Sequence, residues 1–121
     1  MKAARDDTGA GSVLAVTIVA GLICVTTMLV PFYSVLVKKQ ALAGAADAAA
    51  LAAADVRVGL EAGEPCAVAA RVATANGGSL ASCSVDGLVV TVVVSSSIAG
   101  FAVGVAATAG PPDIGSHTGV E

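Results

Sequence analysis

The sequence predicts an α+β protein with a long N-terminal transmembrane helix continuing into an alanine-rich helix, a short second helix and a small antiparallel three-stranded sheet. Three observations carry this prediction. Residues 12–37 contain no charged side chain, residues 38–60 are rich in alanine, and two β-rich runs flank Asp86-Gly87. We therefore expect a short polar leader over 1–11, a membrane span over 12–37, a small domain over 38–110 and a patternless, disordered tail over 111–121.

The apolar run is the first element. A helix over residues 12–37 would be about 39 Å long, against a hydrocarbon layer of roughly 30 Å. The next most apolar run, 98–110, is too short to cross. A buried helix of a soluble domain is the alternative, but a chain of 121 residues has little interior for a helix that is apolar all round. Pro31 lies within the run and predicts a kink one turn before it.

The flanking charges do not decide which way the span points. Lys2 and Arg5 precede it, and Lys38 and Lys39 follow it directly. A secretory signal peptide is a further alternative, with the small-residue site Ala41-Leu42-Ala43 after the run. The run is longer than the usual h-region of about 7–15 residues, which favours an anchor over a cleaved signal.

The alanine-rich segment 38–60 has strong helix propensity, so we expect one helix of about 50 residues that includes the span. Apolar side chains recur along it at steps of four and three, which predicts a narrow stripe for close packing. The stripe consists of Leu42, Ala46, Ala49, Ala53, Val56 and Leu60.

The short second helix is expected over residues 65–76, beginning at Pro65 and stopped by Gly77-Gly78. The β-rich runs after it predict a hairpin with a type I′ turn at Asp86-Gly87, in which Cys83 opposes Val90. In that register Val85 opposes Leu88, and Ala81 opposes Val92. A third strand is expected over 102–109 from the alternation that starts at Phe101.

The three cysteines are of two kinds. Cys24 lies inside the apolar run and is expected to act as a small hydrophobe. Cys66 and Cys83 lie beyond it, and the hairpin register points Cys83 towards the helix that carries Cys66. In an oxidising compartment this predicts a disulfide worth roughly 3 kcal/mol, whereas two reduced thiols are expected in the cytoplasm.

The composition argues against several classes of function. Six dispersed basic residues and a net charge of -3 give no nucleic-acid footprint. One histidine, His117, and scattered acids supply no catalytic constellation, metal cage or nucleotide fingerprint. We therefore expect no enzyme activity, no catalytic residue, no metal site and no cofactor.

The order of these segments resembles type IV pilins and, more closely, the TadE-like pseudopilins of Tad/Flp pilus machinery, of the short type found in high-GC Gram-positive bacteria. Three stretches carry the resemblance: RDDTGAGSVLAV at 5–16, QALAGAADAAALAAA at 40–54, and CAVAARVATANGGSLASCSVDGLVVTVVV at 66–94.

The resemblance implies a minor pilin in the cytoplasmic membrane, with its leader in the cytoplasm and its domain outside or at the cell surface. Its expected partners are membrane lipid, other pilin or pseudopilin subunits, the inner-membrane assembly platform and a prepilin peptidase. The peptidase would cut between Gly9 and Ala10, or after Gly11. Pilins of this kind usually carry a glutamate five residues after the cut, where this chain has Leu14.

Three hypotheses follow. The first is a non-enzymatic TadE-like subunit in pilus assembly or an associated secretion system. The second is an unprocessed single-pass membrane protein whose exported domain binds an unrelated partner. The third is a small protein secreted after cleavage behind Ala43.

Overall fold

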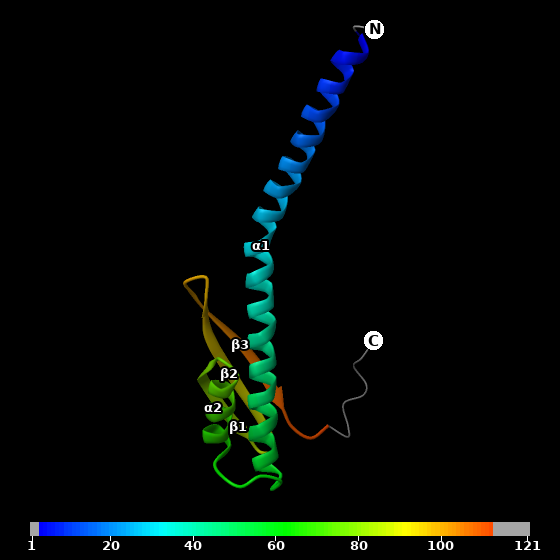
Figure 1. Ribbon diagram of the computed structural model, residues 1–121. Coiled ribbons are helices and arrows are strands. Elements are labelled where there is room, and N and C mark those ends of the chain that lie inside the picture. Colours follow the sequence, from blue (N-terminus) through cyan, green and yellow to red (C-terminus); the bar gives the residue numbers. More distant parts are fainter. Residues whose placement is uncertain (1–2, 113–121) are drawn as a thin grey trace. The chain divides into compact units, whose positions relative to one another are not determined.

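The computed structural model describes the backbone of residues 3–112 and the side chains of residues 9–112 (Figure 1). Most of the expected tail over 111–121 lies outside these residues. The chain divides between Leu36 and Val37 into two compact units. The first contains the apolar part of the helix, and the second contains an α+β domain.

Helix α1 (Ala3–Arg57) is 55 residues long and confirms the single long helix expected from the sequence. It includes part of the leader, and Pro31 lies within it. The helix ends just before Gly59, whose φ of 82° only glycine adopts without strain. Leu60 consequently lies beyond the helix and is 77% exposed, so its assignment to the packing stripe is wrong.

Helix α2 (Pro65–Ala75) begins at the expected residue and ends one residue before the expected position 76, with Asn76 as its C-cap. The Glu64 carboxylate accepts a hydrogen bond from the Ala67 amide at 2.7 Å, which caps the first turn. At the other end Gly77 has a φ of 82°, and the Gly78 amide donates to the Ala73 carbonyl at 2.9 Å. This is the glycine-dependent C-terminal motif that Gly77-Gly78 predicts.

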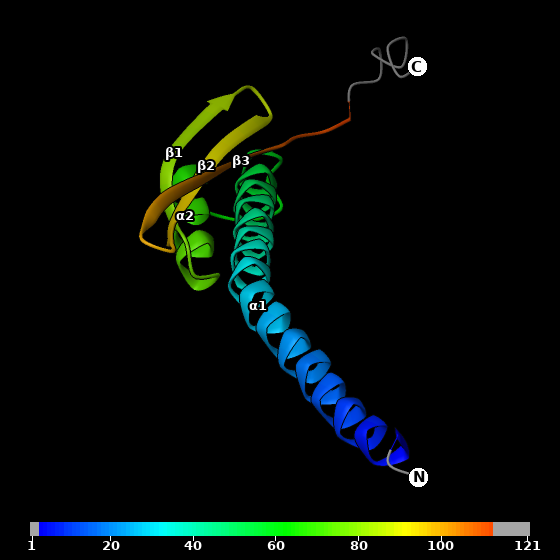
Figure 2. The same ribbon diagram turned by 90° about the horizontal axis from the view of Figure 1, so that it is seen from above.

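Strands β1 (Ser79–Asp86), β2 (Val89–Ile98) and β3 (Phe101–Ala109) form one antiparallel sheet with β2 in the centre (Figure 2). The hairpin register differs from the expected one by two residues. Cys83 pairs with Val92, and Val85 pairs with Val90. A shift of two keeps every side chain on its face, so Cys83 still points to the helices.

The cause of the shift is the position of the first turn. Asp86 stays in the ladder opposite Val89, and Gly87-Leu88 make the turn. Gly87 has a φ of 60°, whereas Leu88 has no positive φ. This fits a type II′ turn, which needs glycine only at its first central position, rather than the expected type I′ turn.

A β-bulge between Leu80 and Ser82 also departs from the expected pairing. Ala81 is left without a partner, so its assignment opposite Val92 is wrong. The extra residue reverses the alternation of side chains, and Leu80 is brought opposite Val94 on the helix-facing side of the sheet.

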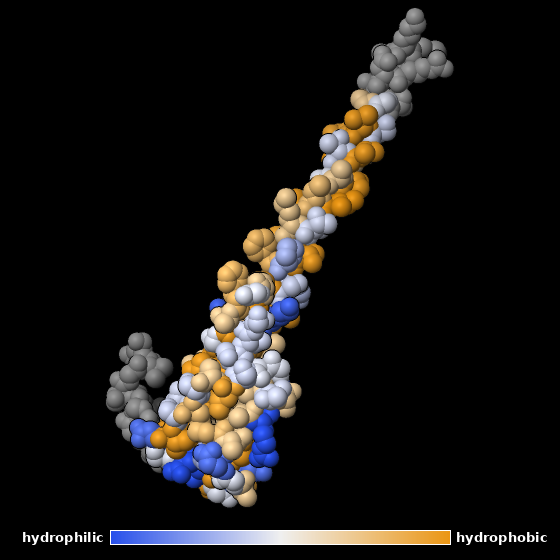
Figure 3. Space-filling view, turned by 90° about the vertical axis from the view of Figure 1, so that its left-hand side faces the viewer, coloured by the Kyte–Doolittle hydropathy of each residue, from blue (hydrophilic) through white to orange (hydrophobic). Residues whose placement is uncertain are grey.

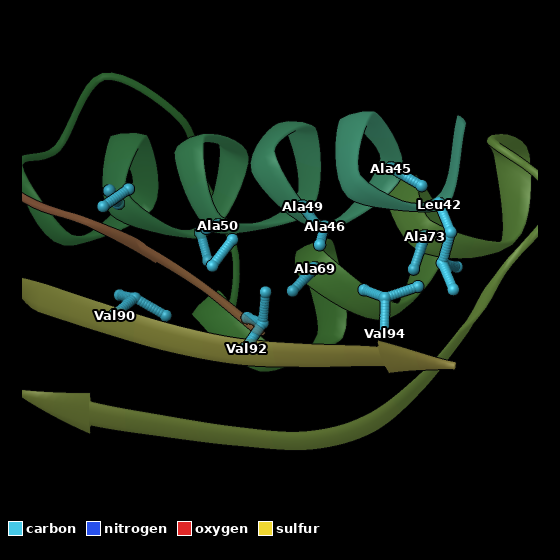
Figure 4. Close-up of a cluster of buried hydrophobic side chains, with 14 of the residues drawn as sticks. Leu42, Ala45, Ala46, Ala49, Ala50, Ala69, Ala73, Val90, Val92 and Val94 are labelled. Carbon is cyan, nitrogen blue, oxygen red and sulfur yellow. The ribbon is translucent and has the colours of Figure 1, made fainter. Parts of the chain in front are cut away.

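The core of the second unit lies between one face of the sheet and the two helices (Figure 4). Val90, Val92 and Val94 of β2 are its largest fully buried side chains. Alanines of α1 and α2 face them, and Ala46, Ala49 and Ala53 of the expected stripe are fully buried. The small side chains let the helices approach the sheet closely. The buried surface of α1 is wider than expected, since it also includes Ala45, Ala50 and Ala54.

Candidate functional site

The apolar part of α1 has no protein contacts that bury it. Its most apolar window is 0% buried, and α1 is the one helix among the described residues that is long and apolar enough to cross a membrane. Large side chains project around its circumference; Leu22, Ile23 and Val25 on successive positions are all more than half exposed. Figure 3 shows hydrophobic side chains along the side of this helix that is turned to the viewer. An apolar surface of this extent requires lipid or other subunits to cover it.

The hydroxyl groups of this segment are compatible with lipid because they bond to the helix itself. Thr26 donates to carbonyl oxygens of the preceding turn at 2.9–3.0 Å, and Thr27 donates to the Cys24 carbonyl at 2.9 Å. Thr17 bonds to the Val13 carbonyl, and Ser34 bonds to the Val30 carbonyl at 3.1 Å. An unsatisfied polar group in the hydrocarbon layer costs several kcal/mol, and these bonds avoid that cost.

The end of the apolar segment has the composition of a membrane–water interface. Phe32 and Tyr33 are 71% and 70% exposed, and Lys38 and Lys39 follow within two turns. Aromatic rings and long basic side chains both favour the headgroup region, where the ring or stem is apolar and the tip is hydrated. Phe32 and Tyr33 were not predicted in this role from the sequence.

The residues tied to prepilin processing and the predicted kink all lie on α1. Gly9 and Ala10, the candidate cleavage pair, are helical and exposed. Leu14, at the position where the pilins that the sequence resembles usually carry glutamate, is 62% exposed. No contact of these residues tests cleavage, and the kink at Pro31 likewise stays a prediction.

The disulfide predicted from the sequence is present. Cys66 in the first turn of α2 is bonded to Cys83 in β1, with 5.9 Å between the two Cα atoms. The bond links the second helix to an edge strand of the sheet. Cys24 is a free, exposed thiol on the apolar part of α1, in agreement with the expected division of the cysteines.

The polar side chains of the domain gather at its surface. An open cleft of about 450 Å³ lies between the end of α1 and α2, and Asp55, Glu61 and Arg71 contribute to its walls. All three side chains are exposed and remain hydrated. No cluster of three potential metal ligands occurs in the described part of the chain, and His117 lies outside that part.

Phe101 is the surface residue that sequence reasoning missed. The alternation in β3 places it on the helix-facing side of the sheet, yet it is 74% exposed. It flanks the β2–β3 turn, and along β3 the burial of this face decreases from Ala107 and Ala109 towards Phe101. Its position next to a turn was the available signal.

Comparison of the chain with protein-family models, with curated proteins and with solved structures gives no match.

Proposed function

We propose that this chain is a non-enzymatic, membrane-anchored TadE-like pilin subunit of a Tad/Flp-type pilus or an associated secretion system. The observation that carries the proposal is the fully exposed apolar part of α1 ahead of a small, disulfide-linked domain. The same surface suits lipid before assembly and neighbouring helices after it, because both environments are apolar. The proposal of the TadE-like family rests on the segment order and on the three stretches that resemble TadE-like proteins.

The disulfide supports an extracytoplasmic domain. Cytoplasmic thiols are kept reduced, whereas disulfides persist in exported proteins. A domain whose core is made mostly of Ala and Val also gains from a covalent link. We therefore assign the leader to the cytoplasm and residues 38–110 to the outside.

The third hypothesis, secretion after cleavage behind Ala43, fits the domain poorly. Ala41, Leu42 and Ala43 lie inside α1, and Leu42 is 4% exposed in the core. Cleavage there would remove a core side chain from the domain, at a cost of about 2–5 kcal/mol if the loss resembles a large-to-small substitution.

Photo-crosslinking in native membranes tests the proposal. A photoreactive residue at Leu22, which is 61% exposed, is expected to crosslink to other pilin-like subunits. The matched control is the same residue at Val92, which is fully buried and is expected to give no intermolecular product. Crosslinks from Leu22 to an unrelated protein alone would refute the pilin assignment.

An unprocessed single-pass membrane protein is the second candidate, and Leu14 in place of the usual glutamate favours it. The mass of the protein from its native membrane separates the two. Processing removes Met1 to Gly9 and leaves Ala10 as the new terminus, or removes two further residues if the cut follows Gly11. An intact N-terminus favours the second candidate and leaves the anchor unaffected.

A further inference from the structure

The β2–β3 hairpin has an apolar, uncharged end. Residues 88–112 contain no charged side chain. The turn is formed by Ala99 and Gly100, with φ values of 52° and 83°, as in the type I′ turns that join two strands tightly. On either side of it, Ile98 and Phe101 are directly paired.

The two paired residues have opposite environments. Ile98 is 4% exposed and belongs to the core cluster, so it fixes the end of the hairpin to the domain. Phe101 is 74% exposed and is the only aromatic residue between 37 and 112. A phenylalanine ring buries roughly 150–250 Å² when it is covered, so leaving it in water forgoes a substantial stabilisation.

This end of the domain holds its first residues, which directly follow the apolar segment in the chain. Ser96, Ser97 and Ile98 line a pocket of about 250 Å³ together with Lys38 and Leu42. Lys38 directly follows the apolar segment in the chain. The hairpin end and the first residue after the span therefore lie within side-chain reach of each other, inside the second unit.

The charged side chains also differ between the two ends of the domain. Asp55, Glu61 and Asp86 belong to the opposite end, where they outnumber Arg57 and Arg71. The Arg57 Nε donates there to the Gly87 carbonyl at 2.8 Å. The end with the hairpin carries Lys38 and Lys39. A basic end attracts anionic headgroups, and an acidic one is repelled.

We propose that the β2–β3 turn is a second membrane contact of this protein. The Phe101 ring enters the interfacial layer of the leaflet in which the span ends, and Lys38 and Lys39 bind anionic phospholipid headgroups beside it. This inference rests on the membrane anchoring of the proposed function. Its consequence is a domain held against the bilayer at one end until assembly removes it.

Tryptophan fluorescence tests the contact directly, because the chain contains no tryptophan. The full chain carrying Phe101→Trp is reconstituted at low density in vesicles of phosphatidylcholine and phosphatidylglycerol, with and without brominated acyl chains. We expect a blue-shifted emission and a loss of intensity with brominated lipid, and both effects should grow with the fraction of phosphatidylglycerol.

Two matched variants calibrate the result. Leu60→Trp, at the opposite end and 77% exposed, is expected to show neither effect, whereas Phe32→Trp in the apolar segment is expected to be strongly quenched. Quenching at position 32 but not at 101 would overturn the second contact and leave the anchor. An absence of quenching at both would overturn the anchor and the contact together. A blue shift at 101 without quenching would mean that protein covers Phe101, which also contradicts the proposal.

Discussion

Gly78 sets how closely three elements of the domain can approach. A Cβ atom added there would overlap Val94 Cγ1 and lie 3.3 Å from Leu42 Cδ1. Both of those side chains are buried in the core, so neither moves freely. Glycine is required here for space, since its φ is not positive.

Gly78→Ala is therefore expected to lower the free energy of unfolding of the domain by about 1–3 kcal/mol, the usual cost of overpacking a filled core. Gly44→Ala is the matched control, because Gly44 is an exposed α1 residue with open space around it. Replacing a helical glycine with alanine is worth about 0.5–1 kcal/mol of stabilisation. Denaturant unfolding in detergent measures both, and equal stabilities of the two variants would contradict this account of the packing.

At the scale of elements, the disulfide joins α2 to β1 and closes a loop between positions 17 residues apart. The double variant Cys66→Ser, Cys83→Ser is expected to lose roughly 3 kcal/mol of stability. Cys24→Ala changes a thiol outside the domain and should leave the stability of the domain unchanged. A double variant as stable as the parent chain would show that α2 and β1 hold together without the bond.

Thiol labelling of the same two cysteines tests on which side of the membrane the domain lies. With an impermeant reagent on intact cells, Cys66 and Cys83 are expected to react only after reduction, because the bond forms outside the cytoplasm. Free reaction of both thiols without reductant would contradict both the bond and the orientation.

The elements themselves were predictable from local pattern, and their exact alignment was not. Alanine content, Pro65 and Gly77-Gly78 define the helices because they act within one turn. The face of the sheet on which Cys83 lies was also predictable, since Cys83 lies on the helix-facing side with either turn. The bulge at Ala81 and the position of the first turn depend on contacts across the sheet, such as Leu80 beside Val94, which no local pattern contains.

The same limit applies to the candidate site. The apolar segment and the cysteine pair follow from sequence because length and alternation suffice. The exposure of Phe101 does not, because it depends on how far the core extends along β3, while Ile98 opposite it is buried. Leu60 was misplaced because α1 ends at Arg57 and does not continue to residue 60.

For the whole molecule, the decisive property is that the apolar part of α1 has no protein cover of its own. The domain needs none of that surface for its core, whose α1 members begin at Leu42. We therefore expect the apolar segment to act as an anchor that is independent of the fold of the domain.

The most direct measurement is the extraction of the full-length protein from its native membrane. We expect the protein to stay in the membrane fraction through high salt and alkaline carbonate and to be released only by detergent, since about 20 apolar residues suffice to hold a helix in the hydrocarbon layer. Recovery of the full-length chain as a water-soluble monomer without detergent would contradict the membrane anchor and the pilin assignment with it.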